Sequence, residues 1–165
     1  MSEICDAGVL IVVDNYSSDA TAAVAASHGA DRVFFEPHNH IARALNAGAE
    51  ETAAEQLVFV DADTQIPGET LRKALANLDS GKFAAGGARL VMDQPVIPIV
   101  GWLTNNWNRI GAIFRYAAGS FFYCRRDAFE AGGGFDETVY AGEEVWLDRR
   151  IKKWAKKQKL GFCVI

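Results

Sequence analysis

The chain has 165 residues, of which 50% are hydrophobic and 23% are charged, and its formal net charge is −4. This composition excludes an intrinsically disordered chain and gives no reason to expect nucleic acid as a partner. A chain of this length buries about two-thirds of the surface that its unfolded form exposes, so we expect a single domain with one core.

Cysteines and apolar runs indicate the cellular compartment. Cys5, Cys124 and Cys163 are far apart and form no CxxC pair, which predicts reduced thiols and neither a disulfide framework nor a zinc site. The N-terminus carries Glu3 and Asp6 in place of a basic stretch, and every apolar run is shorter than the ~20 residues that span a bilayer. We expect a cytoplasmic protein, with contact at the inner face of the membrane as an open alternative.

Short apolar runs followed by helix-like segments recur in the first half of the chain. Val9–Val13 and Leu57–Val60 are rich in β-branched residues and lack polar alternation, which is typical of strands buried on both faces of a parallel sheet. A helix-like segment follows each run, from Ala20 to Ala26 and from Pro67 onward. This alternation of strand and helix predicts an α/β domain.

Other elements follow from the same patterns. Asn39 is expected to cap a helix that extends to Ala54, and Gly132–Gly134 is expected to form a turn. The remaining predicted elements are strands at Arg32–Phe35, Phe83–Met92 and Ala118–Cys124, an aromatic-faced helix around Trp102–Phe114, a helix at Glu143–Lys157, and a strand-like end at Leu160–Ile165.

Two of these helices allow two interpretations each. Trp102 and Trp107 either belong to the core or cover a lipid-linked acceptor, because aromatic residues at helical spacing serve both purposes. The helix at Glu143–Lys157 has an apolar stripe and basic residues on its other faces, which either form a solvated surface or attract anionic lipid headgroups. Those basic residues are Arg149, Arg150, Lys152, Lys153, Lys156 and Lys157.

Each of the two apolar runs ends in an aspartate. Ligands of an open α/β sheet bind beyond the carboxyl ends of the strands, where Asp14 and Asp61 fall, although aspartate also forms turns and caps in such loops. Asp63 lies two residues beyond Asp61, so both carboxylates can bind one hard cation, Mg²⁺ or Mn²⁺. His38 and His40 are a weaker metal candidate, and a polar turn is the simpler interpretation.

Five blocks occur in one order along the chain: VVDNYSSDAT, ARALNAGAE, VFVDADT, GSFFYCRRDAFEAGGGFDE and GEEVWLDRRIKK. Together they resemble a family 2 glycosyltransferase of the GT-A fold, from about Val9 to Ile165. The resemblance implies a single α/β domain with a mostly parallel sheet flanked by helices. It also implies that residues 1–92 form the half that binds a nucleotide-sugar and that residues 93–165 form the acceptor-side half.

The resemblance assigns roles on the donor side. It implies that Asp14 contacts the base of the nucleoside, that Asp61 contacts the ribose or the metal shell, and that Asp63 is the main metal ligand. Asn15 stands where the family often has a second aspartate, so recognition of the base is expected to differ there. Arg43 either adds a guanidinium to the nucleotide pocket or is a solvated helical side chain.

The acceptor side contains the expected catalytic acid pair. Glu143 and Glu144 match the acidic pair of the family, whose second member, usually Asp, acts as general base on the acceptor hydroxyl. The alternative is that both glutamates merely stabilise the first turn of a helix, where the macrodipole favours the ionised form. Gly119 and Ser120 fall in the block that the family places near the donor sugar and the acceptor.

We therefore expect metal-dependent transfer of a sugar, with inversion, from a nucleoside-diphosphate-sugar to a saccharide or a lipid-linked acceptor. The alternative is a non-catalytic module that binds a nucleotide-sugar. It stays open because the family usually has a strand ahead of Val9 and further structure, often with a metal-binding histidine, beyond Ile165. A Rossmann dehydrogenase fits poorly, since no GxGxxG follows the first strand.

Overall fold

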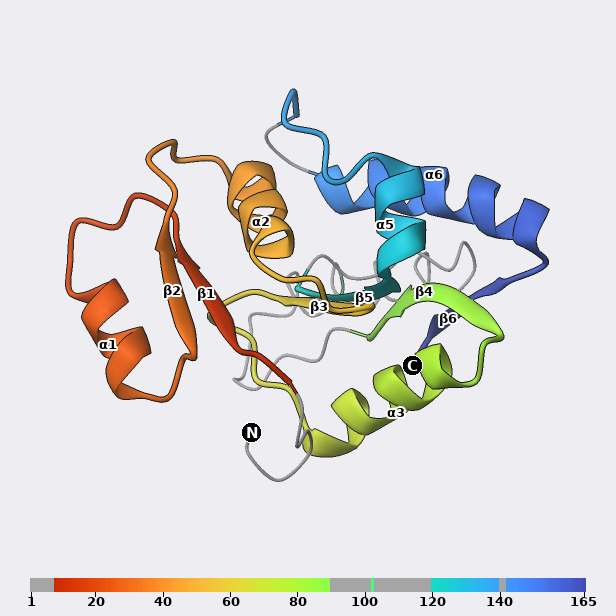
Figure 1. Ribbon diagram of the computed structural model, residues 1–165, viewed down its shortest axis with the longest axis horizontal. Coiled ribbons are helices and arrows are strands. Elements are labelled where there is room, and N and C mark those ends of the chain that lie inside the picture. Colours follow the sequence, from red (N-terminus) through yellow and green to blue (C-terminus); the bar gives the residue numbers. More distant parts are fainter. Residues whose placement is uncertain (1–7, 90–101, 103–119, 140–141) are drawn as a thin grey trace.

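A computed structural model of the chain describes residues 8–89, 102, 120–139 and 142–165 (Figure 1). The helices are α1 (Thr21–Ser27), α2 (Ile41–Glu50), α3 (Gly68–Asp79), α5 (Arg126–Gly132) and α6 (Glu143–Gln158). The strands are β1 (Ile11–Asp14), β2 (Arg32–Phe35), β3 (Gln56–Val60), β4 (Phe83–Gly87), β5 (Phe121–Arg125) and β6 (Gly161–Val164).

A two-stranded parallel sheet is formed by the first βαβ unit. β1 pairs with β2 in a register that joins Ile11 to Arg32 and Asp14 to Phe35, and the strand predicted at Arg32–Phe35 is confirmed. α1 connects the two strands and contacts both, while α2 packs on β1. The two-stranded sheet therefore stands between α1 and α2 (Figure 1).

A four-stranded sheet carries the rest of the described chain, in the order β3-β5-β4-β6. β5 is antiparallel to both β3 and β4, whereas β4 and β6 are parallel. Three of the four strands point the same way, but the reversed strand β5 lies between them, so two of the three pairings are antiparallel and the sheet is mixed. The prediction that Leu57–Val60 is buried on both faces of a parallel sheet was wrong, because, among the described strands, β3 is an edge strand that pairs only with the antiparallel β5. The strands before residue 92 alternate in this sheet with those after it, so the two expected halves share one sheet.

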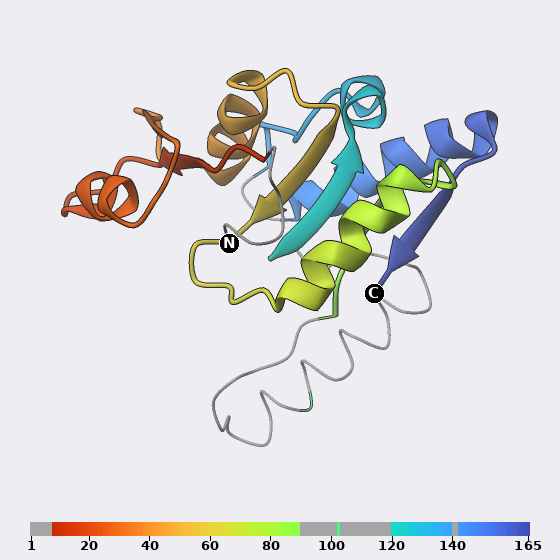
Figure 2. The same ribbon diagram turned by 60° about the horizontal axis from the view of Figure 1, so that its bottom comes forward.

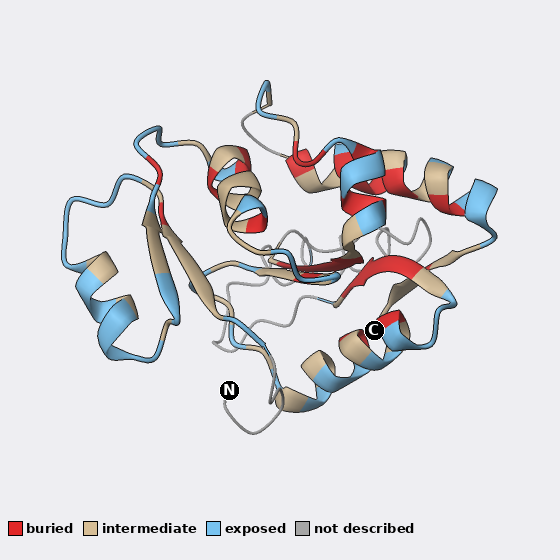
Figure 3. Ribbon diagram, viewed as in Figure 1, coloured by how far each residue is buried: buried red, intermediate tan, exposed pale blue. Residues whose placement is uncertain are grey.

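Helices cover both faces of this sheet, with α3 on one side and α2, α5 and α6 on the other (Figures 1 and 2). Because successive side chains of a strand point to opposite faces, alternate residues of β5 pack against different helices. Phe122 and Cys124 belong to the larger core against α5 and α6, while Phe121 and Tyr123 pack with α3. All four are at most 3% exposed, and the two inner strands of the sheet, β5 and β4, are mostly buried (Figure 3).

The start and end predicted for α2 were wrong. The cap residue is His40, which has an extended backbone, so Asn39 lies outside the helix. The helix ends at Glu50 and does not reach Ala54, because the guanidinium of Arg126 takes up carbonyl groups at this end and in the following turn. Arg126 donates to the carbonyl oxygens of Ala49 (3.1 Å), Thr52 (2.6 Å) and Ala54 (2.7 Å).

The short helix α5, at Arg126–Gly132, was not among the predicted elements. It ends in a Schellman motif: Gly133 has φ +75° and donates to the carbonyl of Glu130, and Gly134 donates to that of Phe129. The predicted glycine turn is therefore the C-terminal stop of a helix, and its first glycine belongs to that helix.

Several predicted segments lie partly outside the described residues. The strand predicted at Phe83–Met92 is observed as far as Gly87, and residues 90–92 are outside. The predicted aromatic helix is outside except for Trp102, which is helical and 61% exposed. Among the described helices, none is long and apolar enough to cross a membrane. Cys124 and Cys163 are free thiols, and Cys5 is outside.

Candidate active site

Asp61 directly follows β3 and begins a tight turn. Its backbone N–H donates to the carbonyl of Ser120 at 3.2 Å, which extends the β3–β5 ladder by one bond, and its own carbonyl accepts from Thr64 at 3.0 Å. The turn leaves Asp63 exposed. The fold thus brings Ser120 beside Asp61, as the expected site requires, while Gly119 lies outside the described residues.

Glu143 and Glu144 form the first turn of α6. The helix begins after Gly142, whose φ of +77° is accessible to glycine without strain. Glu143 is buried and 6% exposed, and Glu144 is half-buried. Both carboxylates lie at the positive end of the helix macrodipole.

A cleft of about 260 Å³ joins these two regions, with Asp61 on its wall from β3 and Glu143 and Glu144 on its wall from α6. The rest of the lining is largely apolar and comprises Ile41, Leu45, Phe59, Val60, Phe122, Phe135 and Gly142. Apolar walls around converging carboxylates favour the binding of a charged ligand in a defined orientation.

Two carboxyl groups of this cleft, those of Asp61 and Glu144, have raised pKa values. Burial raises the pKa of Asp61, and the negative charges of Asp63 and Glu143 raise it further. Burial also raises the pKa of Glu144, with Glu143 and Asp61 adding to the effect against an opposing backbone hydrogen bond. A cation placed among these groups would offset this mutual repulsion.

The donor atoms fit a hard cation that is shared with a ligand. Asp61 and Asp63 offer carboxylate oxygens, which Mg²⁺ and Mn²⁺ prefer. In the described part of the chain, no three His, Cys, Asp or Glu side chains converge as a metal site. Oxygens of a bound phosphate or of water would add to the coordination of a metal held by Asp61 and Asp63. His38 instead faces Glu36, with 2.9 Å between Nδ1 and Oε1.

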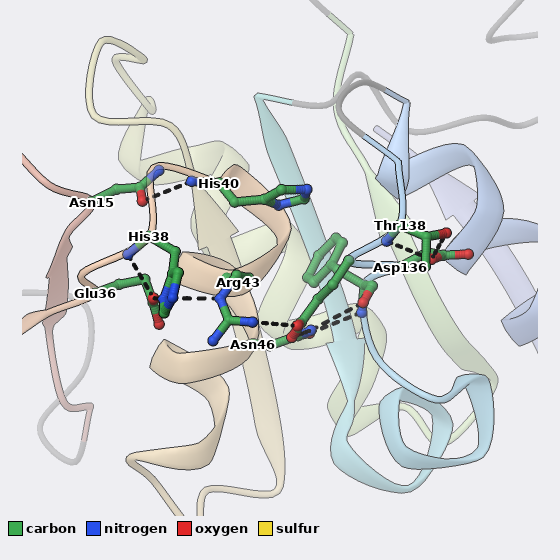
Figure 4. Close-up of polar contacts among 10 residues, drawn as sticks. Asn15, Glu36, His38, His40, Arg43, Asn46, Asp136 and Thr138 are labelled. Carbon is green, nitrogen blue, oxygen red and sulfur yellow. Dashed lines mark hydrogen bonds and ion pairs between the residues drawn. The ribbon is translucent and has the colours of Figure 1, made fainter.

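Asp14 and Asn15 lie at the carboxyl end of β1, where they were expected. Asp14 is 7% exposed, and its Oδ1 accepts the backbone N–H of Ser17 at 2.9 Å. Asn15 Oδ1 accepts the backbone N–H of His40 at 3.1 Å, which ties the end of β1 to the start of α2 (Figure 4). Neither residue is among the described residues that line the cleft.

Arg43 bridges two glutamates. Its Nε lies 3.4 Å from Glu36 Oε1, and its Nη1 lies 3.1 Å from Glu137 Oε2 (Figure 4). The side chain is 39% exposed and is not among the described residues of the cleft wall. A contact between Arg43 and a nucleotide would have to compete with these ion pairs.

Asn46 is a residue that no motif singled out. Its Nδ2 donates to the carbonyl of Phe135 and to Glu137 Oε1, each at 3.0 Å, and its Oδ1 accepts the N–H of Phe135 at 2.9 Å. Phe135 lines the cleft, so Asn46 fixes one of its walls. Asparagine is a poor former of helix interiors, and its place in α2 was the available signal of a tertiary hydrogen bond.

Comparison with known proteins identifies a family and two relatives of the chain. The model of the family described as "Glycosyl transferase family 2" matches residues 9–133. An uncharacterized glycosyltransferase of Mycobacterium bovis and one of Mycobacterium tuberculosis are each 35% identical to the chain over 100 residues, covering 59% of this chain and 45% of the relative. The chain therefore spans less than half the length of these relatives.

Solved structures share the fold. The mannosyltransferase PcManGT from Pyrobaculum calidifontis, in complex with GDP-Man and Mn²⁺, matches with a TM-score of 0.61 at 22% identity, covering 86% of this chain and 42% of that one. S. aureus TarS 1-349 in complex with UDP matches with a TM-score of 0.63 at 17% identity, covering 87% and 45%. These likenesses confirm the expected GT-A fold.

Proposed function

The chain belongs to glycosyl transferase family 2, and from this membership we propose that the protein transfers a sugar from a nucleoside-diphosphate-sugar to an acceptor hydroxyl, with inversion at the transferred carbon. The acceptor is a saccharide or a lipid-linked saccharide. We place the reaction in the cytoplasm, a compartment that the free thiols Cys124 and Cys163 fit.

The observation that carries this proposal is the cleft between β3 and α6. Asp61 and Glu144 both line it, although they come from segments about 80 positions apart in the sequence. A diphosphate with its cation beside Asp61 and an acceptor hydroxyl beside Glu144 would place the transferred sugar between them. Direct displacement with inversion requires the nucleophile and the leaving group to lie on opposite sides of the reacting carbon.

We propose Glu144 as the general base, with Glu143 as its charged neighbour. Glu144 takes the proton of the acceptor hydroxyl, the acceptor oxygen bonds to the anomeric carbon, and the bond from that carbon to the diphosphate breaks with its electron pair leaving on the diphosphate. The raised pKa of Glu144 brings its basicity closer to that which proton abstraction near neutral pH requires.

We assign the donor to the other wall. Asp63 and Asp61 would hold Mg²⁺ or Mn²⁺, which when bound offsets the charge that develops on the leaving diphosphate. Asp14 and Asn15 would contact the nucleoside. Arg43 would serve the nucleotide pocket either directly or by holding its neighbours in place.

Ser120 and Gly119 would lie near the transferred sugar. The carbonyl of Ser120 already bonds to the N–H of Asp61, which supports this assignment for Ser120.

Calorimetry with the nucleoside diphosphates UDP and GDP, each with and without Mn²⁺, tests the donor side. We expect one of them to bind in a Mn²⁺-dependent manner, and Asp63→Asn to weaken binding about ten-fold or more, because a charged ligand of the cation is lost. Asp79→Asn is the matched control, since Asp79 lies at the end of α3 and accepts a hydrogen bond from Gln56.

Turnover of a panel of donor sugars tests the catalytic side. Glu144→Gln should abolish transfer while leaving nucleotide affinity nearly unchanged, because the amide cannot take the proton. Binding without turnover in the full-length protein would support a nucleotide-sugar-binding module instead. Failure of both diphosphates to bind with Mn²⁺ would remove the donor assignment.

A further inference from the structure

The strongest concentration of positive charge in the described chain lies on α6. Seven of the 17 lysines and arginines fall within residues 149–159, a stretch without Asp or Glu, although the chain as a whole has a net charge of −4. This local excess contrasts with α3 on the opposite side of the sheet, where Glu69 pairs with Lys73 and the charges are mixed.

One exposed face of α6 collects most of this charge around a tryptophan. We define the basic face as the exposed residues Trp146, Arg149, Lys153, Lys156 and Lys157. At 100° per residue these positions fall within an arc of about 100°, so they point the same way from a helix that is ~24 Å long.

The opposite side of α6 is buried in the core. It contains Leu147, Ile151 and Ala155, each at most 2% exposed. α6 is held against the sheet by this apolar stripe, so the basic face is directed away from the core. The side chains of the basic face are therefore presented outward together.

Trp146 is the unusual member of the basic face. Its side chain is 49% exposed, and the guanidinium carbon of Arg149 lies 5.4 Å from its ring centroid. The indole of Trp146 is thus an apolar group set among the cations of the basic face. Tryptophan with flanking lysines and arginines is favoured at the interface between lipid headgroups and acyl chains, where the indole is amphipathic and the cations reach phosphate.

We propose that the basic face of α6 docks the protein on an anionic membrane surface. Glu144 precedes Trp146 by two residues, about 200° around the helix axis, so the cleft and the basic face lie on opposite sides of α6.

Sedimentation with vesicles tests the docking. The probes are vesicles of phosphatidylcholine alone and vesicles in which about one-third is phosphatidylglycerol, compared at low and high salt because screening weakens exposed charge pairs. The chain should bind the anionic vesicles and release at high salt. A chain with Lys153→Gln, Lys156→Gln and Lys157→Gln should bind about 100-fold more weakly, at about five-fold for each lysine.

A matched triple variant controls for net charge. Arg72→Gln, Lys73→Gln and Lys82→Gln alter exposed residues on the α3 side and change the formal net charge by the same three units, to −7. This variant should retain most of the vesicle binding. Equal losses in the two triple variants would overturn the proposal, as would failure of the unaltered chain to prefer anionic vesicles, or binding to heparin without binding to vesicles.

Quenching of fluorescence by brominated lipid tests the tryptophan. Binding should quench the emission of the chain, and Trp146→Phe should remove most of that quenching while sedimentation persists. Quenching that is unchanged in Trp146→Phe would place the contact elsewhere and overturn the assignment. Nucleotide calorimetry is done without vesicles and vesicle binding without nucleotide, so a failed donor site and a failed docking face are told apart.

Discussion

Asn46 binds both backbone polar groups of Phe135, across 89 positions of sequence. The side-chain amide of Asn46 thus satisfies the backbone N–H and carbonyl of Phe135, as a neighbouring strand does in a sheet. These bonds hold the ring of Phe135 in the wall of the cleft. Gly134 is part of this fit, since a Cβ on Gly134 would lie 2.9 Å from Asn46 Oδ1. One helical side chain therefore fixes the loop that follows α5.

Replacing Asn46 by alanine should lower the free energy of unfolding by about 1–3 kcal/mol, because the N–H and carbonyl of Phe135 lose their partner. For a chain of this size each kcal/mol corresponds to a drop of about 2–4 °C in Tm. Urea unfolding measures the change. Gln158→Ala, at an exposed amide, should change stability by less than about 0.5 kcal/mol, and an equal effect of the two substitutions would contradict the role of Asn46.

Replacing Glu143 by glutamine should alter the pH dependence of stability. Burial and neighbouring charges raise the pKa values of Asp61 and Glu144 above their unfolded values. The folded state therefore binds more protons in that range, and stability falls as pH rises through the folded pKa values. Glu143→Gln removes one of the charges responsible, so the fall should be smaller in the variant, as measured by urea unfolding from acid to neutral pH.

Glu69→Gln is the control for this experiment, because the pKa of Glu69 is shifted in the opposite direction. The ammonium of Lys73 lowers the pKa of Glu69, so the ionised carboxylate stabilises the fold above its unfolded pKa. The glutamine should remove that contribution at neutral pH and have no effect at low pH, where the carboxyl is protonated. Parallel behaviour of the two variants would show that the carboxylates of the cleft are not coupled as described.

Glu143→Gln should also move the pH profile of sugar transfer, if Glu144 is the base. Loss of the Glu143 charge lowers the pKa of Glu144, so the acid limb of kcat/KM should shift to lower pH. The measurement is kcat/KM for a productive donor over a pH series. An acid limb that keeps its position in Glu143→Gln would argue against Glu144 as the titrating group.

Lys159→Gly should stabilise the end of α6. Lys159 has φ +60°, and the following N–H, of Leu160, bonds back to Ala155 at 2.9 Å in a Schellman motif. A left-handed conformation costs a residue with a side chain about 1 kcal/mol, whereas glycine adopts it freely. Thermal unfolding should show a Tm higher by about 2 °C. Gln158→Gly, inside the helix, should lower Tm instead, and a loss of stability in Lys159→Gly would contradict the motif.

Gly86→Ala should be among the most damaging substitutions. A Cβ at Gly86 would overlap the carbonyl oxygen of Cys163 and the hydroxyl of Tyr123, which donates to that same carbonyl. Because backbone atoms of a central sheet cannot withdraw, we expect a loss of more than about 3 kcal/mol. Gly81→Ala meets no atom within 4 Å and has φ +64°, so strain alone should cost it about 1 kcal/mol in the same unfolding assay.

Local patterns by themselves determined much of this protein. Short apolar runs predicted β1 and β3 to within two residues, and β2 at its observed bounds, although none of these strands is buried on both faces. The apolar stripe predicted α6, since apolar residues that recur with the 3.6-residue period of a helix lie on one face and pack against the core. Asp61 was predicted at the end of a strand because it directly follows the apolar run Leu57–Val60.

The tertiary structure alone decided the strand order and the contacts between residues distant in sequence. Insertion of β5 between β3 and β4 set Ser120 beside Asp61, and strand order depends on pairings between distant segments that no local period records. The contact of Asn46 with Phe135 and the ion pair of Arg43 with Glu137 likewise join residues about 90 positions apart. Sequence therefore identified the carboxylates of the cleft, and folding alone supplied its apolar walls and the partners that hold them.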